Sequence, residues 1–249
     1  MERMYLAIVL CPLLAAVLAG LFGRQIGRVG AHTITIAGVG ASFAMSLLVL
    51  KNQWFDGAPA FNGAVYTWAV VDGVTMDVGF LVDRLTALMM VVVTSVSLMV
   101  HVYTIGYMHE DPGYQRFFSY ISLFTFAMLT LVMANNFMQL FFGWEAVGLV
   151  SYLLIGFWYT RPTAIFANMK AFLVNRVGDF GFILGIALIL MATGSLDYAT
   201  VFAKAPEVST QTIEVWTGTP WSVMTVACIL LFVGAMGKSA QMPLHVWLP

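Results

Sequence analysis

Charged residues are scarce in this 249-residue sequence, and their scarcity excludes most soluble folds. Only 9% of the residues are Asp, Glu, Lys or Arg, while 61% are hydrophobic. Soluble domains carry about 25% charged residues. The mean hydropathy is +0.89. The formal net charge is −1, so the composition gives no reason to expect binding to nucleic acid. Together these values predict a protein that crosses a lipid bilayer several times.

Cysteine is also rare, and the usual cofactor motifs are missing. Cys11 and Cys228 each lie within an apolar run, where we expect them to pack as small hydrophobic residues rather than to form a disulfide or a metal site. The sequence has no CxxC motif, no glycine-rich dinucleotide loop after a strand and no P-loop. We therefore expect no cofactor and no metal on this chain.

Long apolar runs are plentiful. A membrane-spanning helix takes about 20 apolar residues, and the runs predict an all-α polytopic membrane protein with about seven transmembrane helices. The first run lacks a small-residue cleavage site and is expected to be retained. The predicted spans are residues 4–22, 32–50, 84–105, 117–133, 137–158, 164–192 and 221–237.

The connections between the spans differ in character. Residues 54–82 alternate apolar and polar residues around Asp72 and Gly73, which predicts a small β-hairpin outside the bilayer. We expect residues 23–30 to form a short loop and residues 194–220 to form a polar surface segment. Lys and Arg concentrate in the loops after the first, third and fifth spans, which predicts that the hairpin and the N-terminus face outward.

The sequence stops at Pro249 inside an apolar pattern, without a polar tail. Natural chain ends are usually polar and exposed. We therefore expect this sequence to be the first part of a longer protein.

Glu145 lies near the middle of the fifth predicted span. A carboxylate at that depth costs roughly 2.5–3.5 kcal/mol on insertion scales, so it must meet protein or water. Gly143 and Gly148 flank it and would let another helix or water approach closely. An ionisable residue inside the membrane indicates a functional site; a protonated acid in a structural hydrogen bond is the alternative.

Lys238 stands at the end of the seventh predicted span, five residues before Pro243. Proline cannot donate the helical hydrogen bond, so the helix should break just after Lys238. Carbonyls freed at membrane depth are tolerated only where they meet protein or water, so we expect an ion site at the break. The alternative is that Lys238 snorkels towards the membrane surface.

The sixth predicted span carries a polar line. Arg176 and Asp179 are three residues apart, so they share a helix face and can pair. Lys170 adds another charge, and Asn168 and Asn175 extend the same side of the helix. A purely structural ion pair is the alternative. The glycines of this span predict close helix packing: Gly178, Gly181 and Gly185.

Two histidines are candidates for proton relay. Thr94, Ser97, His101 and Thr104 form a polar stripe on the third span. Histidine titrates near neutral pH, so His101 could relay a proton, although a packing role is the alternative. His245 lies after Lys238, with a proline between them, and is the second candidate.

Four stretches of this sequence resemble a known family. They are residues 77–108, 117–159, 170–185 and 238–249, and their most specific motifs are GWE at 143–145, NRVGD at 175–179 and KSAQMPLHVWLP at 238–249. These residues resemble the N-terminal portion of subunit L, the largest antiporter-like membrane subunit of NADH-quinone oxidoreductase (respiratory complex I). Paralogous subunits and the large Na⁺/H⁺ antiporter subunits share the GWE motif and the lysine at a broken helix.

The resemblance implies an all-helical, antiporter-like fold of inverted five-helix repeats, with one discontinuous helix in each repeat. It implies that Glu145 and Lys238 form a proton relay, with Arg176 and Asp179 as a polar pair near Glu145; we expect Lys170 to be a further supporting charge. Residues 1–116 would hold the first three helices and the hairpin, and residues 117–249 the first repeat, which continues beyond this sequence.

Our main functional hypothesis is a non-redox, proton-translocating subunit of NADH-quinone oxidoreductase. Its expected partners are the other membrane subunits of complex I, including paralogous antiporter-like subunits, with protons, internal water and the lipid bilayer. A bacterial inner (plasma) membrane is expected, with the mitochondrial inner membrane as the alternative. A subunit of a multisubunit Na⁺/H⁺ antiporter is the alternative function. A third hypothesis is a structural module whose buried charges only hold helices together.

Overall fold

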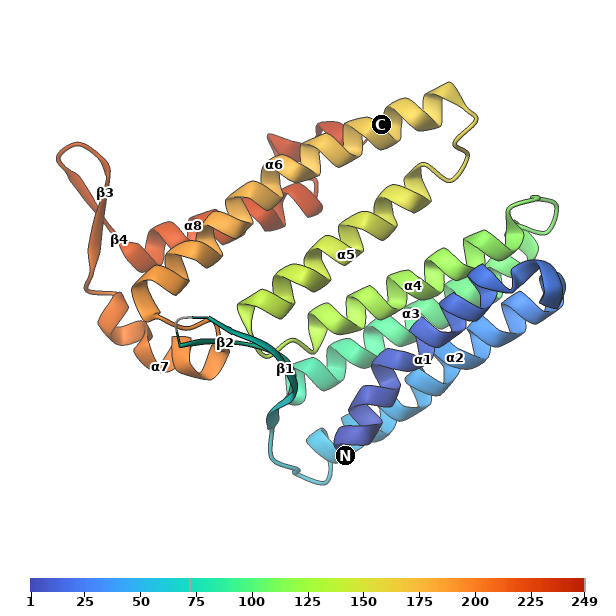
Figure 1. The fold of residues 1–249 in the computed structure, drawn as a ribbon, viewed down its shortest axis with the longest axis horizontal. Helices are drawn as coiled ribbons and strands as arrows, with labels where there is room; N and C mark the ends of the chain where they lie inside the picture. Colours follow the sequence, from blue (N-terminus) through green and yellow to red (C-terminus); the bar gives the residue numbers. More distant parts are fainter. Residues whose placement is uncertain (72, 249) are drawn as a thin grey trace. The chain divides into compact units, whose positions relative to one another are not determined.

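The computed structural model describes residues 1–71 and 73–248 (Figure 1). The elements in chain order are α1 (Glu2–Leu21), α2 (Gly23–Trp54), β1 (Phe61–Val71), β2 (Val74–Val82), α3 (Arg84–Tyr107), α4 (Tyr114–Val132), α5 (Phe137–Ile155), α6 (Pro162–Thr193), α7 (Tyr198–Val208), β3 (Thr212–Trp216), β4 (Thr219–Ser222), α8 (Val223–Lys238) and η1 (Leu244–Trp247).

The prediction of an all-helical membrane fold is confirmed. Helices α1 to α6, within the part of the chain that the structure describes, are long and apolar enough to cross a membrane. The seventh predicted span is the shorter α8, which has 16 residues. At 1.5 Å per residue, α8 rises about 24 Å, which is less than the ~30 Å hydrocarbon core. An α8 that begins at the membrane surface therefore ends, at Lys238, inside the membrane.

The connection expected between the first two spans is not a loop. Residues 23–30 belong to α2, and the chain kinks at Gly27, where φ is +69°. Only glycine adopts such a backbone freely, and it lets helical turns on either side change direction. Arg24 and Arg28 lie in this segment, and both are exposed, as suits a helix end at the membrane surface.

The two polar connections are more ordered than their composition suggests. The hairpin predicted at 54–82 is present as β1 and β2, with Gly73 at φ +79°; Asp72 of its predicted turn lies outside the described residues. The segment 194–220 was expected to be a surface segment only. It contains α7, which Asp197 caps by accepting a hydrogen bond from the Thr200 N–H at 2.8 Å, and the antiparallel hairpin β3–β4.

The chain forms two compact units, and the first comprises Met1–Val65, Gly79–Ala134 and Phe142–Phe157. In this unit α1 packs against α2 and α4, and α2 packs against α3 (Figure 1). One buried hydrophobic cluster joins these helices to strand β2. Members of the cluster that are fully buried are Ile8, Val49, Val82, Ala87, Met90, Leu129 and Met133.

Serine side chains satisfy backbone groups of α1. Pro12 lies inside α1 and has no N–H, so the Ile8 carbonyl loses its intrahelical donor. Ser42 of α2 donates its hydroxyl to this carbonyl at 2.8 Å, and Ser122 of α4 donates to the Pro12 carbonyl at 2.8 Å. Two neighbouring helices are thus attached to α1 where proline opens it.

The second unit comprises Tyr66–Val78, Asn135–Phe141 and Trp158–Pro249. Helices α6 and α8 lie along each other, and the predicted close packing of the glycine face of α6 is confirmed (Figure 1). A Cβ atom added to Gly181 would lie 2.8 Å from the Val233 side chain, and one added to Gly185 would lie 3.0 Å from Leu231. The division at residues 116 and 117 and the outward orientation stay predictions.

Replacing Ser42 with Ala should destabilise the first unit by about 1 kcal/mol, because the Ile8 carbonyl then has no donor at membrane depth. Ser46 is the matched control: it is equally buried on α2, but its hydroxyl only joins a carbonyl of its own helix, that of Ser42. Denaturant unfolding of the purified chain in detergent micelles measures both variants. Equal losses for S42A and S46A would contradict this role of Ser42.

Candidate functional site

Asp179 is the centre of a buried charge cluster in the second unit. Its side chain is 5% exposed and lies between two cations. Its Oδ2 is 3.4 Å from Nη1 of Arg176, and its Oδ1 is 3.7 Å from Nζ of Lys238. The expected Arg176–Asp179 pair is therefore present, and Lys238, which sequence reasoning paired with Glu145, joins it. We call these three residues the charge triad.

Backbone contact brings the charge triad together. Gly178 precedes Asp179 on α6, and Gly237 precedes Lys238 on α8. A Cβ added to Gly178 would lie 3.2 Å from the Gly237 Cα, so the two helices touch at these positions without intervening side chains. Such an approach requires small residues at the contact. In the sequence, a glycine directly precedes each charged residue, in Gly178-Asp179 and in Gly237-Lys238, and this pattern could have indicated the contact.

The predicted helix break lies beside the triad. Helix α8 ends at Lys238, and the short helix η1 follows Pro243. The Gly237 carbonyl accepts a hydrogen bond from the Ala240 N–H at 3.3 Å and from Nε1–H of Trp247 at 3.0 Å. Ala240 itself is left-handed, with φ +49°. The chain therefore folds back on the last turn of α8, and Trp247 is a site residue that sequence reasoning missed.

The members of the triad differ in what they can do. Arg stays protonated in proteins, whereas the lysine amine and the aspartate carboxyl can each gain or lose a proton. Arg176 also lies over the Phe172 ring, 4.8 Å from its centroid. A carboxylate between two cations is electrostatically stabilised, and removing one partner of such a buried pair leaves an uncompensated charge. The triad thus combines two groups that can change protonation state with one permanent charge.

Glu145 lies in the first unit, in the middle of α5. The side chain is partly buried, and its Oε1 atom is shielded from solvent. The expected close approach at Gly143 is present, because a Cβ there would lie 2.7 Å from the Leu131 Cα of α4. The relay between Glu145 and Lys238 stays a prediction.

His101 is fully buried in the first unit and belongs to a polar network. Its Nδ1 lies 2.8 Å from the Ser97 carbonyl oxygen and 3.3 Å from the Ser97 hydroxyl. The Ser97 hydroxyl in turn bonds to that of Thr125 on α4, at 2.5 Å. Among the described residues, the other ring nitrogen, Nε2, has no hydrogen-bond partner although it is buried. The predicted polar stripe therefore exists; its role in proton relay stays a prediction.

Two further predicted residues lie in the second unit, outside the triad's ion pairs. Lys170 is partly buried on α6, nine residues before Asp179, which corresponds to about 13 Å along the helix. His245 lies in η1 and is exposed. The roles expected for these residues also stay predictions.

The second unit has a polar cavity of about 420 Å³. It is lined in part by Asp77, Asn135, Asn136, Asp197 and Lys204. Lys204 donates to the carbonyl of Thr193, the last residue of α6, at 2.7 Å, where a cation is favourable. Close by in the chain, burial raises the pKa of Tyr198. Because the lining mixes carboxylates, amides and an ammonium group, it indicates no single class of ligand.

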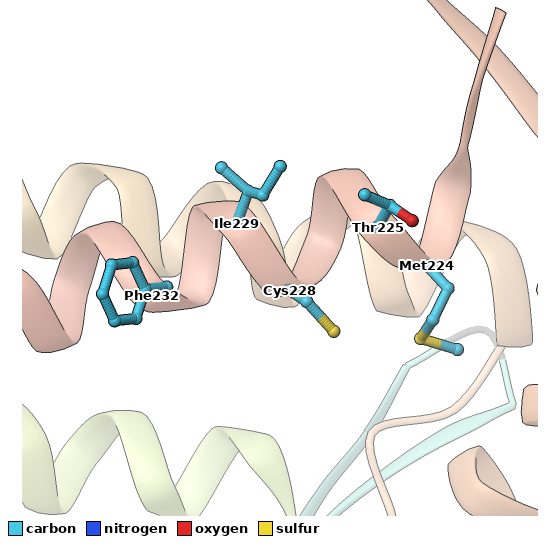
Figure 2. A pocket seen from close by; sticks show the side chains of 5 residues that line it. All are labelled: Met224, Thr225, Cys228, Ile229 and Phe232. Carbon is cyan, nitrogen blue, oxygen red and sulfur yellow. The ribbon is translucent and has the colours of Figure 1, made fainter.

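A second hollow lies on α8 and is apolar. Figure 2 shows its lining side chains: Met224, Thr225, Cys228, Ile229 and Phe232. Its one titratable side chain is that of Cys228, which is exposed. The charge triad is therefore the arrangement of this unit that best suits proton chemistry.

Gly178→Ala should destabilise the protein by about 1–3 kcal/mol, because the new methyl group overpacks the contact with Gly237. Gly106→Ala is the matched control: nothing lies within 4 Å of its added Cβ in α3, so the change should stay within about 0.5 kcal/mol. Thermal unfolding in detergent, followed by circular dichroism, compares them. If G178A unfolds at the same temperature as G106A, the backbone contact does not hold the helices together.

Comparison with known proteins places the chain in a family. The family model described as "NADH:quinone oxidoreductase/Mrp antiporter, TM" matches residues 134–249. The model described as "NADH-Ubiquinone oxidoreductase (complex I), chain 5 N-terminus" matches residues 68–118.

Curated relatives agree with these models. NADH-quinone oxidoreductase subunit L of Neisseria meningitidis serogroup B is 65% identical over 249 residues, which are 99% of this chain and 37% of that protein. Subunit L of Rickettsia bellii is 45% identical over 97% of this chain and 37% of its own length. NADH-ubiquinone oxidoreductase chain 5 of Neurospora crassa is 43% identical over 99% of this chain and 33% of its own length. The chain thus spans little more than a third of these relatives.

Solved structures show the same fold. A chain of the archaeal membrane-bound sulfane sulfur reductase has a TM-score of 0.79 at 18% identity, covering 98% of this chain and 46% of its own. A chain of the Mrp complex from Dietzia sp. has a TM-score of 0.77 at 24% identity, and the match covers 99% of this chain and 25% of that chain. The relatives and the family models show that the chain belongs to the family of antiporter-like membrane subunits that includes NADH-quinone oxidoreductase subunit L.

Proposed function

We propose that this protein acts as a proton-translocating membrane subunit of NADH-quinone oxidoreductase. The observation that carries the proposal is the charge triad, in which Lys238 lies 3.7 Å from Asp179 beside a helix break. A buried carboxylate with two partly buried cations between two apolar helices is costly, and ionisable residues inside membranes commonly mark ion or proton pathways. The identity of 65% to a subunit L supports the choice of complex.

In this proposal Lys238 is the group that takes up and releases the proton. Arg176 keeps its charge and holds the Asp179 carboxylate at 3.4 Å, so the carboxylate stays close to Lys238 as the lysine changes state. A charge that moves nearby changes the balance between the protonated and neutral lysine. Glu145 would be such a charge. Redox energy from partner subunits would drive the change in its charge.

The proposed contribution of this chain is non-redox. Flavin, iron–sulfur and quinone chemistry would belong to partner subunits, and this chain would contribute the proton path. The partners would be other membrane subunits of the complex, including paralogous antiporter-like ones, with internal water along the path. The proposed location is a bacterial inner membrane, which the similarity to the bacterial relative from Neisseria meningitidis supports.

A subunit of a Na⁺/H⁺ antiporter is the second candidate. One family model names the Mrp antiporter together with NADH:quinone oxidoreductase, and an Mrp complex shares the fold. Sodium-driven proton efflux by the complex, with no NADH-linked activity, would select this candidate.

Lys238→Met and Glu145→Gln should each slow proton transfer through this subunit by about tenfold or more, since about 1.4 kcal/mol on a barrier is a factor of ten. The measurement is proton uptake per NADH oxidised in inverted membrane vesicles that contain the whole complex. Lys51→Met is the control, because Lys51 is exposed and only pairs with Asp56 at 4.0 Å on the surface.

The amount of assembled complex separates the outcomes. Normal pumping by an assembled complex that carries Lys238→Met would overturn the proposed function. Reduced assembly together with normal pumping by the complexes that do form would select the structural module instead.

A further inference from the structure

We propose that Trp247 is a positioning residue for Lys238. Its indole N–H would hold the last turn of α8 against α6 and thereby keep the lysine amine beside Asp179. The proposal rests on the proposed function, because it assigns Trp247 a role in the proton transfer that Lys238 performs.

The first argument is the hydrogen bonding at the break. The last four carbonyls of a helix have no partner within it. The Ala235 and Met236 carbonyls accept from the backbone N–H groups of Ser239 and Gln241, at 2.9 and 3.0 Å. The Gly237 carbonyl has backbone contacts with the N–H groups of Ser239 and Ala240, the latter at 3.3 Å, and the Trp247 side chain supplies a bond of 3.0 Å. Within a membrane, a carbonyl left without a donor costs several kcal/mol.

The second argument is the place where this bond acts. Gly237 is the residue whose backbone touches Gly178, and each glycine directly precedes a member of the charge triad. The Lys238–Asp179 distance of 3.7 Å is near the upper limit for an ion pair. A small shift of the Gly237 peptide would therefore separate the two charges.

The third argument is the choice of side chain. Tryptophan combines a large apolar ring with a single N–H donor and no acceptor, so it can close a helix end inside an apolar environment. Leu244 of the same short helix η1 also faces this position, because a Cβ added to Gly237 would lie 3.7 Å from it. Helix η1 thus contacts α8 through the packing of Leu244 and through the directed Trp247 hydrogen bond, which is the side-chain bond to the Gly237 carbonyl.

Trp247→Phe tests the role of the bond, because it keeps an aromatic ring and removes the donor. In vesicles that contain the whole complex, we expect unchanged NADH oxidation and an about fivefold slower proton transfer through this subunit, the factor that one ordinary hydrogen bond gives. Trp54→Phe is the matched control. It removes a similar bond, from Nε1 of Trp54 to the Arg84 carbonyl at 3.2 Å, in the first unit, and it should pump normally.

The same substitution in a Lys238→Met background separates positioning from general stability. If Trp247 acts through Lys238, then adding W247F to K238M lowers pumping no further. An additional loss of pumping in the double variant would overturn the proposal, as would normal pumping by W247F alone. Normal pumping by K238M would instead overturn the proposed function, so the two failures are distinguishable.

Hydrogen exchange of the tryptophan indole groups tests the bond without any substitution. In the ¹⁵N-labelled protein in micelles, the Trp247 indole N–H should exchange more slowly than that of Trp216, which is 69% exposed on β3. Equal exchange rates would show that the Trp247 bond does not persist and would overturn the proposal, even if W247F failed to fold.

Discussion

The contact between Gly178 and Gly237 is the constraint on which the site depends. It lets two helix backbones meet without side chains between them, and it places Asp179 and Lys238 next to the point of contact. Inside a membrane, charges are tolerated when they pair or meet water, so the helices and the charges support each other. Larger residues at the contact would move the helices apart, and the carboxylate would lose a cation.

The break in α8 leaves the carbonyls of its last turn without helical donors. An α8 of 16 residues that begins at the membrane surface would end within the apolar layer, where these carbonyls need other donors. The backbone of residues 239–241 and the indole of Trp247 provide them. The chain itself thus supplies the donors for the open end of α8, next to Lys238.

In the first unit too, side chains of neighbouring helices hydrogen-bond to polar groups that would otherwise lack a partner. Pro12 frees a carbonyl of α1, and Ser42 of the next helix donates to it. His101 is buried with Ser97 and Thr125 as hydrogen-bonding neighbours. Hydroxyl groups suit this task because they are small and can donate to a backbone carbonyl without bringing a charge into the membrane.

Much of the fold could be predicted from the sequence, because it depends on local properties. Run length and hydropathy determined the spans, proline at 243 determined the break after Lys238, and helix geometry determined that Arg176 and Asp179 share a face. The helical path through Gly27 was not predictable in the same way, since two arginines there suit a loop and a helix end equally well. Tertiary structure alone decided that Lys238 meets Asp179, 59 residues earlier, and that Trp247 reaches back to Gly237. The physical reason is that a periodic pattern identifies which face of a helix is polar or small, whereas the helix that covers this face is chosen by packing between distant parts of the chain.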